Sequence, residues 1–138
     1  MDDIVVGIDE SETAARAATV AAEMAQALGV NLHLVTCADK SRSVELKVGS
    51  DRFHTDWLAK AELFLEDTAR KLAYDQVTQA VGTGNPATVL CDEAERVGAR
   101  MLVVGNRRVQ GVARVLGSVA GDVLKHAECD VLIVNTTS

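Results

Sequence analysis

The sequence predicts a single α/β domain over residues 1–138, with a doubly wound, five-stranded parallel sheet and two helices on each face. Short, almost continuous apolar runs are typical of strands covered on both faces. Segments with a helical period separate these runs, and the order is β-α-β-α-β-α-β-α-β. Because right-handed crossovers join parallel strands, strict alternation places helices on both sides of the sheet. The length of 138 residues suits one domain.

The first half of the chain supplies two strands and two helices. Residues 3–8 form a β-branched apolar run that predicts the first strand, and Leu32, Leu34 and Val35 indicate a second strand over residues 31–37. Between them, apolar side chains recur at helical spacing from Ala14, nearly all of them alanine, and Gly29 can close this helix. Residues 38–51 are polar and aperiodic, which predicts a long loop, and residues 53–74 carry one apolar stripe, which predicts the second helix.

The second half repeats the same alternation. Residues 76–81 predict a third strand, and the turn over residues 82–86 places Asn85 as a helix cap and Pro86 at the first helical position. The third helix should end at Gly98. Residues 101–104 and 131–134 are two more buried-type runs, with a helix predicted over residues 118–127 between them.

Composition excludes several classes of function. The net charge of -6 and the two Phe, one Tyr and one Trp disfavour nucleic-acid binding, which needs basic patches or stacking aromatics. No apolar run approaches the roughly 18 to 20 residues of a membrane span, and two aspartates open the chain where a signal peptide needs positive charge. We therefore expect a cytoplasmic protein without membrane or nucleic-acid partners. Three cysteines without a C-x-x-C spacing predict neither a disulfide framework nor zinc.

The segment after the fourth strand is the strongest candidate for chemistry. Residues 105–118 contain three glycines and three arginines, and a Gly117-Ser118 pair precedes a helix. Glycines let a backbone approach a phosphate, and a helix N-terminus attracts anions. The same composition also fits a surface loop in which Ser118 only caps the helix, because glycine-rich loops are weak motifs.

Other motifs do not match their known contexts. Gly82-x-Gly84-x-x-Ala87 imitates a dinucleotide fingerprint, but no acidic residue ends the next strand to hold a ribose. The sequence has no H-E-x-x-H, no G-x-S-x-G and no Walker-type lysine. Metal-protease, hydrolase-elbow and P-loop chemistry are therefore not predicted.

Several short motifs together resemble the universal stress protein family. They are Gly7-Ile8-Asp9 after the first strand, Gly84-x-Pro86 after the third, Val103-Val104-Gly105-Asn106 at the fourth, and Gly117-Ser118-Val119 followed by residues 131–134. The similarity extends over essentially the whole chain. It implies a fold of five parallel strands and four helices, a homodimer, and, in one subgroup, binding of ATP or another adenine nucleotide.

Carried onto this sequence, the resemblance makes Gly105 the first glycine of the phosphate motif and Gly117-Ser118 its final pair. Arg108 replaces the second glycine. It would either grip phosphate through its guanidinium, with Arg107 or Arg114, or fill the pocket. Asp9 would face the ribose or a nucleotide-bound Mg²⁺ or Mn²⁺, and Thr36 would meet adenine through its backbone. The implied nucleotide site comprises Ile8, Asp9, Thr36, Gly84, Gly105, Arg107, Arg108, Gly117, Ser118 and Val119.

The sequence therefore predicts a regulatory binding module for ATP, AMP or cyclic AMP, with at most slow, incidental ATP hydrolysis. One alternative is a family member that binds no nucleotide and acts through protein contacts, with Arg108 in the cleft. Another is an enzyme of the wider adenine nucleotide α-hydrolase-like group, for whose extra catalytic elements the chain has little room. The homodimer would pair through the last strand, at Asp130, Val131, Leu132, Ile133 and Val134.

Overall fold

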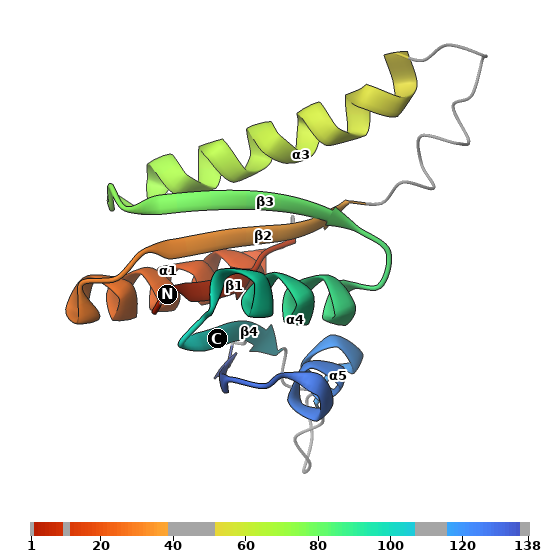
Figure 1. Cartoon of the computed structure of the whole chain (residues 1–138). Helices are drawn as coiled ribbons and strands as arrows, with labels where there is room; N and C mark the ends of the chain where they lie inside the picture. Colours follow the sequence, from red (N-terminus) through yellow and green to blue (C-terminus); the bar gives the residue numbers. More distant parts are fainter. Residues whose placement is uncertain (1, 10–11, 39–51, 107–115, 136–138) are drawn as a thin grey trace.

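The computed structural model describes residues 2–9, 12–38, 52–106 and 116–135. The described strands are β1 (Ile4–Gly7), β2 (Leu32–Ala38), β3 (Val77–Thr83), β4 (Met101–Asn106) and β5 (Asp130–Asn135). The described helices are α1 (Glu12–Leu28), α3 (Arg52–Lys71), α4 (Pro86–Val97) and α5 (Ser118–His126). The strands form one parallel sheet in the order β3-β2-β1-β4-β5, which confirms the predicted α/β fold (Figure 1).

The path of the chain reverses once within the sheet. From β1 it winds outward through β2 to β3, then crosses back to place β4 on the other side of β1 and β5 at the far edge. β1 and β4 are in direct register, with Ile4 beside Met101 and Val6 beside Val103. In open α/β sheets, ligands bind outside the carboxyl ends of the strands at such a reversal. The topology therefore directs attention to the ends of β1 and β4.

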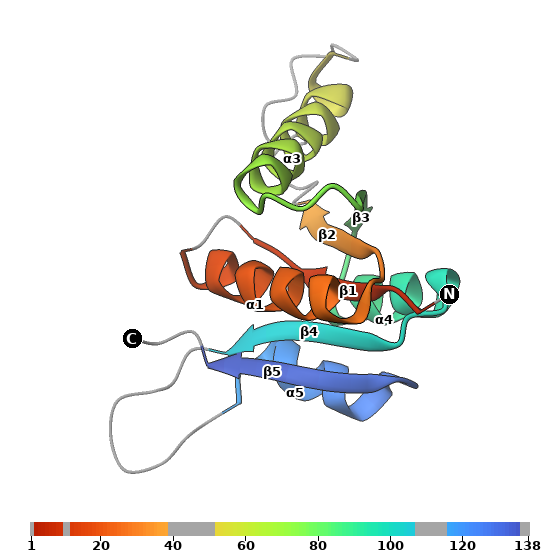
Figure 2. The same ribbon diagram turned by 90° about the vertical axis from the view of Figure 1, so that its left-hand side faces the viewer.

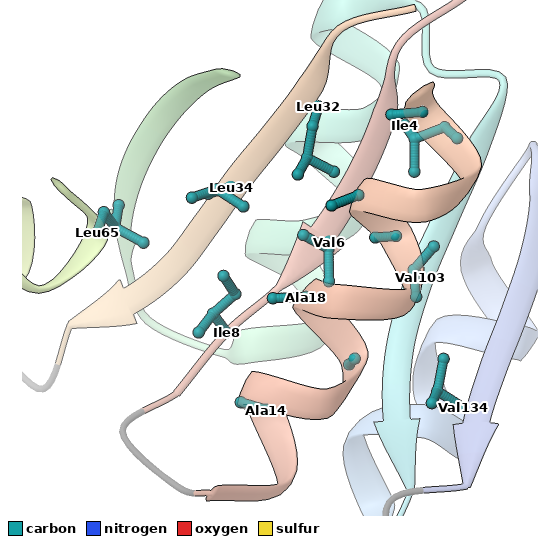
Figure 3. Close-up of a cluster of buried hydrophobic side chains, with 14 residues drawn as sticks. Ile4, Val6, Ile8, Ala14, Ala18, Leu32, Leu34, Leu65, Val103 and Val134 are labelled. Atoms are coloured by element: carbon teal, nitrogen blue, oxygen red, sulfur yellow. The ribbon is translucent and has the colours of Figure 1, made fainter. Parts of the chain in front are cut away.

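One face of the sheet packs against α1 and α3. Ile4 and Val6 of β1 point to this side, where Leu34 of β2 and Leu65 of α3 complete the core (Figure 3). The predicted alanine face of α1 is buried here, and its small side chains let the helix backbone lie close to the strands. The buried alanines are Ala14, Ala17, Ala18, Ala21, Ala22 and Ala25.

The opposite face packs against α4 and α5. Side chains alternate along a strand, so Val5 points away from its neighbours Ile4 and Val6 and meets Leu90 of α4 and Val123 of α5 in a second core. The two cores place two of the described helices on each face, as predicted (Figure 2).

The second predicted helix ends earlier than expected. α3 stops at Lys71 rather than Tyr74, and Ala73 takes a left-handed backbone with φ of 53°. The Tyr74 hydroxyl donates a hydrogen bond to the carbonyl of Val30 at 2.6 Å. Tyr74 therefore belongs to the turn that ties the end of α3 to the segment before β2, a tertiary contact that a helical period does not reveal.

The third strand is longer than expected at its carboxyl end. β3 spans Val77–Thr83 rather than residues 76–81, because all seven residues of β2 pair with it, through to Ala38 beside Thr83. Gly82 is thus a strand residue. A Cβ at Gly82 would collide with Val89 Cγ1 of α4, so its glycine serves close packing of helix on sheet.

The start of α4 follows the prediction. Asn85 caps the helix by accepting a hydrogen bond from the Thr88 N–H at Oδ1, at 3.1 Å, Pro86 is its first residue, and Gly98 follows its end. Of the predicted loop over residues 38–51, residues 39–51 lie outside the described part of the chain. No helix among the described residues is long and apolar enough to cross a membrane.

Candidate functional site

A cavity of about 210 Å³ lies at the carboxyl ends of the central strands, where the winding reverses. It draws on both halves of the sheet and on three of the helices. It is lined by Gly7, Ile8, Asp9, Ala14, Val35, Cys37, Pro86, Leu90, Val104, Gly105 and Val119. Its position is the one that the topology indicates for a ligand.

The inner walls of the cavity are aliphatic. Val35 and Val104 are buried strand residues on the face toward α4, and Leu90 of α4 closes this side. Leu90 can approach only because β1 ends in glycine, since a Cβ at Gly7 would lie 2.7 Å from Leu90 Cδ1. An aliphatic wall with few polar groups suits a flat heterocycle.

Asp9 supplies the negative charge of the site. It lies two residues after the end of β1, is exposed, and is the one carboxyl side chain among the described residues that line the cavity. A carboxylate accepts hydrogen bonds from hydroxyl groups and is a hard oxygen ligand for Mg²⁺ or Mn²⁺. Asp9 is therefore suited to a sugar hydroxyl or to a cation carried by a ligand.

A side-chain clasp fixes the start of α5 beside the end of β4. Asn106, the last residue of β4, accepts a hydrogen bond at Oδ1 from the Gly117 N–H at 2.7 Å. Gly117 is the N-cap of α5, and Val119 in its first turn lines the cavity. The first N–H groups of a helix lack intrahelical acceptors and attract anions. The clasp thus brings an anion-attracting helix end next to Gly105.

A second contact holds the turn between β3 and α4. The Cys37 thiol, near the end of β2, donates a hydrogen bond to the Gly84 carbonyl at 3.1 Å. Gly84 has a φ of +107°, a conformation that favours glycine. Pro86 follows two residues later and lines the cavity. The thiol therefore helps to set the wall that the turn contributes.

The structure brings together part of the predicted site. Ile8, Asp9, Gly105 and Val119 line the cavity, although they come from distant parts of the sequence. The remaining predicted residues that are described lie beside it. Gly117 and Ser118 begin α5, Gly84 accepts the thiol hydrogen bond, and Thr36 is buried between two lining residues of β2. Arg107 and Arg108 lie outside the described residues.

Sequence reasoning missed residues that shape the cavity. They are Gly7, Ala14, Val35, Cys37, Pro86, Leu90 and Val104, which line it, and Asn106, whose side chain accepts a hydrogen bond from Gly117. Leu90 could have been found, because it stands four residues after Pro86 and so shares its helical face. The hydrogen bond between Asn106 and Gly117 had no local signal, since the two residues are eleven positions apart in the sequence.

The size of the cavity limits what it encloses. Ligand pockets usually measure roughly 300 to 1,000 Å³. A volume of about 210 Å³ therefore encloses only part of a ligand of ordinary size, and the rest of such a ligand would extend past Gly105 toward α5. Within the described ranges, no three His, Cys, Asp or Glu side chains gather as a metal-binding group. A cation at Asp9 would therefore have to be completed by the ligand.

Comparison with known proteins agrees with this architecture. The sequence model of the universal stress protein family matches residues 1–135. A universal stress protein of Mycobacterium tuberculosis strain H37Rv is 30% identical over 144 residues, which cover 97% of this chain and 96% of the relative.

Two solved structures with bound nucleotides are similar over nearly their full length. A universal stress protein crystallised with cyclic AMP has a TM-score of 0.70 and 29% identity, covering 99% of this chain and 98% of the other. The universal stress protein from Archaeoglobus fulgidus in complex with dAMP has a TM-score of 0.69 and 25% identity, covering 97% and 98%.

Proposed function

Because the chain belongs to the universal stress protein family, we propose that it binds an adenine nucleotide in the cavity at the carboxyl ends of β1 and β4. The observation that carries the proposal is the meeting of Asp9, Gly105 and Val119 around one aliphatic cavity at the reversal of the sheet. Similar chains that hold cyclic AMP and dAMP support adenine as the base.

Each part of the nucleotide has a matching surface. Adenine would lie against Val35 and Leu90, where burial of its faces is favourable. The ribose hydroxyls would donate hydrogen bonds to the Asp9 carboxylate. The phosphate would lie against the backbone of Gly105, where the absence of a side chain permits close approach. It would also face the N-terminus of α5. With a triphosphate, a Mg²⁺ or Mn²⁺ ion would neutralise phosphate charge, and Asp9 is the carboxylate placed to ligate it.

The site suits binding better than turnover. The described residues that line the cavity include one carboxylate and no histidine, whereas acid-base catalysis of hydrolysis needs a positioned base beside the attacking water. We therefore propose a regulatory module whose signal is nucleotide occupancy. Turnover of ATP at enzyme-like rates, abolished by Asp9→Asn, would contradict this part of the proposal.

The direct test is nucleotide retention and affinity. Freshly purified protein is denatured, and any released nucleotide is identified by mass. Calorimetric titrations with ATP, AMP and cyclic AMP then give affinities for the emptied protein. We expect at least one of them to bind with a one-to-one stoichiometry. A protein that carries no nucleotide and gives no heat with any of the three would contradict the proposal.

We also propose a homodimer that pairs through β5. This strand ends the sheet order and pairs with β4 on one side, so its other edge is the sheet boundary (Figure 2). Val131, Leu132 and Ile133 on it are half-buried. An apolar strand at a sheet edge is a template for pairing with another chain. Isologous pairing of two such edges would join the sheets of two protomers.

A further inference from the structure

A second cavity, of about 380 Å³, lies on the face of the sheet covered by α4 and α5. It is separate from the cavity at Asp9 and has none of its lining residues in common with it. Helix α4, the end of α5 and the turn before β5 form its walls. Its lining includes Cys91 and Asp92 of α4, His126 at the end of α5, and Cys129 before β5.

Two cysteines far apart in the sequence line this one cavity. Cys91 lies in the middle of α4, and Cys129 immediately precedes β5. Both thiols are half-buried and pack against the same apolar core on this face. The third cysteine, Cys37, lies at the other cavity, where its thiol donates to the Gly84 carbonyl.

The Cys129 thiol lies near enough to Cys91 for its charge to affect the ionisation of Cys91. Burial raises the pKa of Cys91, and the charge of a Cys129 thiolate raises it further, as does Asp92. Burial also raises the pKa of Cys129; backbone hydrogen bonds at Cys129 and Leu102 lower this pKa in part, and the charge of Asp130 raises it. The ionised pair is therefore disfavoured, and at neutral pH both groups are predominantly neutral thiols.

We propose that Cys91 and Cys129 form an oxidisable dithiol pair, which a hydroperoxide converts into an intramolecular disulfide joining α4 to the start of β5. Among the described residues around the pair, no three His, Cys, Asp or Glu side chains are arranged to hold a metal ion. A hydroperoxide is small enough to enter a cavity of this volume.

The chemistry balances in two steps. One thiolate attacks a peroxide oxygen, the O–O bond breaks, and the products are a sulfenic acid and water or an alcohol. The second thiol then attacks the sulfenic sulfur, the S–O bond breaks, and the hydroxyl leaves as water while the S–S bond forms. The two thiols lose two electrons and two protons, and the peroxide is reduced. Because the thiolate is the nucleophile and both pKa values are raised, the rate should increase with pH above neutrality.

The test maps disulfides in the folded, full-length protein. Reduced protein is treated with hydrogen peroxide, remaining thiols are blocked with N-ethylmaleimide, and the chain is cut with trypsin. We expect a cross-link between the peptides of residues 72–96 and 126–138, with the Cys37 peptide, residues 17–40, carrying the blocking group. The cross-linked fraction should not depend on protein concentration, because the bond forms within one chain.

Two controls make the result specific. Cys37→Ser should leave the cross-link unchanged, whereas Cys91→Ser and Cys129→Ser should each abolish it. Oxidation in concentrated urea should give all three pairings of the cysteines, because the native approach of the two segments is then lost.

Two results in the folded wild-type protein would overturn the proposal. The first is recovery of Cys91 and Cys129 as blocked thiols or sulfinic acids without a cross-link. The second is a cross-link that involves Cys37. Neither result depends on whether a substituted protein folds. A disulfide needs Cα atoms about 4.4 to 6.8 Å apart, so the cross-link also tests how closely α4 approaches the turn before β5.

Discussion

Asn106 Oδ1 accepts a hydrogen bond from the Gly117 N–H at 2.7 Å, although the two residues are eleven positions apart in sequence. Asn106 ends β4, and Gly117 caps the helix whose first turn lines the proposed nucleotide cavity. The contact therefore sets where the amino end of α5 stands relative to Gly105.

We expect Asn106→Ala to weaken nucleotide binding by about fivefold, which corresponds to one hydrogen bond of about 1 kcal/mol. The start of α5 would no longer be held beside β4, so the phosphate would lose a preorganised partner. Calorimetric titration measures the effect. Asn31→Ala is the matched control, because Asn31 uses its backbone carbonyl, in a hydrogen bond from Ile4, at the other end of the sheet. Equal nucleotide affinities for the wild type and Asn106→Ala would show that the hydrogen bond between Asn106 and Gly117 does not contribute to nucleotide binding.

Gly7→Ala should disturb the wall of the nucleotide cavity. The new Cβ would lie 2.7 Å from Leu90 Cδ1 and 2.9 Å from Cδ2, so the leucine side chain must move. Overpacking of this kind usually costs about 1 to 3 kcal/mol of stability. We expect a lower free energy of unfolding in urea and weaker nucleotide binding.

Gly121→Ala is the matched control for that substitution. It adds the same methyl group inside α5, where nothing lies within 4 Å of the new Cβ. Replacing a helical glycine with alanine should stabilise the protein by about 0.5 to 1 kcal/mol. If Gly7→Ala and Gly121→Ala had the same unfolding midpoint, a clash with Leu90 could not be the cause of any loss of stability in Gly7→Ala.

Asp9→Asn should reduce affinity for adenosine nucleotides by about tenfold or more, because a hydrogen bond to a charged group contributes about 1.5 to 3 kcal/mol. Free adenine, which lacks the ribose, should bind both proteins equally. Asp75→Asn changes an exposed aspartate at the opposite end of the sheet and should leave both affinities unchanged. If adenine binding fell as much as nucleotide binding, Asp9 would be acting on the fold of the cavity rather than on the sugar.

Glu93 should make the stability of the fold depend on pH. Its Oε1 accepts hydrogen bonds from Arg96 and from Nε2 of buried His33, at 2.8 Å for the histidine. The hydrogen bond from Arg96 lowers the pKa of Glu93 most; burial opposes this, and His33 lowers the pKa further. A pKa below the unfolded value adds stability above the unfolded pKa, and this stability is lost as pH falls through the folded pKa.

Urea unfolding between neutral and acidic pH measures this contribution. The wild type should lose stability below the ordinary glutamate pKa of about 4.3. Glu93→Gln should be less stable at neutral pH and should lose less on acidification. Glu95→Gln, an exposed neighbour on the same helix, should follow the wild-type profile. Parallel profiles for the wild type and Glu93→Gln would show that another carboxyl group is responsible.

Sedimentation at micromolar concentration should give the mass of two chains. Ile133→Lys places a charge on the edge strand, where lysine is a natural deterrent to strand pairing, and should yield a folded monomer by sedimentation and circular dichroism. Leu63→Lys, at an exposed position of α3, should remain dimeric. A wild-type monomer, or an Ile133→Lys dimer, would contradict pairing through β5.

Much of the fold was predictable because its signals are local. The buried runs of β1 and β4, the alanine face of α1 and the Asn85-Pro86 start of α4 each depend on residues within a few positions of one another. The predicted end of α3 was wrong because the Tyr74 hydroxyl donates a hydrogen bond to the carbonyl of Val30, which is far away in sequence. The candidate site was predictable where a motif stands at the carboxyl end of a strand, as at Asp9 and Gly105, and not where aliphatic side chains such as Leu90 complete it.

The sequence alone determined the alternation of strands and helices, and with it the sheet and the end of the sheet where a ligand would bind, because hydrophobic period and capping are properties of short segments. Only the tertiary structure decided which distant groups meet. It set β4 beside β1, joined Asn106 to Gly117 by a hydrogen bond, and brought Cys91 and Cys129 to one cavity. These contacts depend on how whole elements pack, which no local pattern encodes.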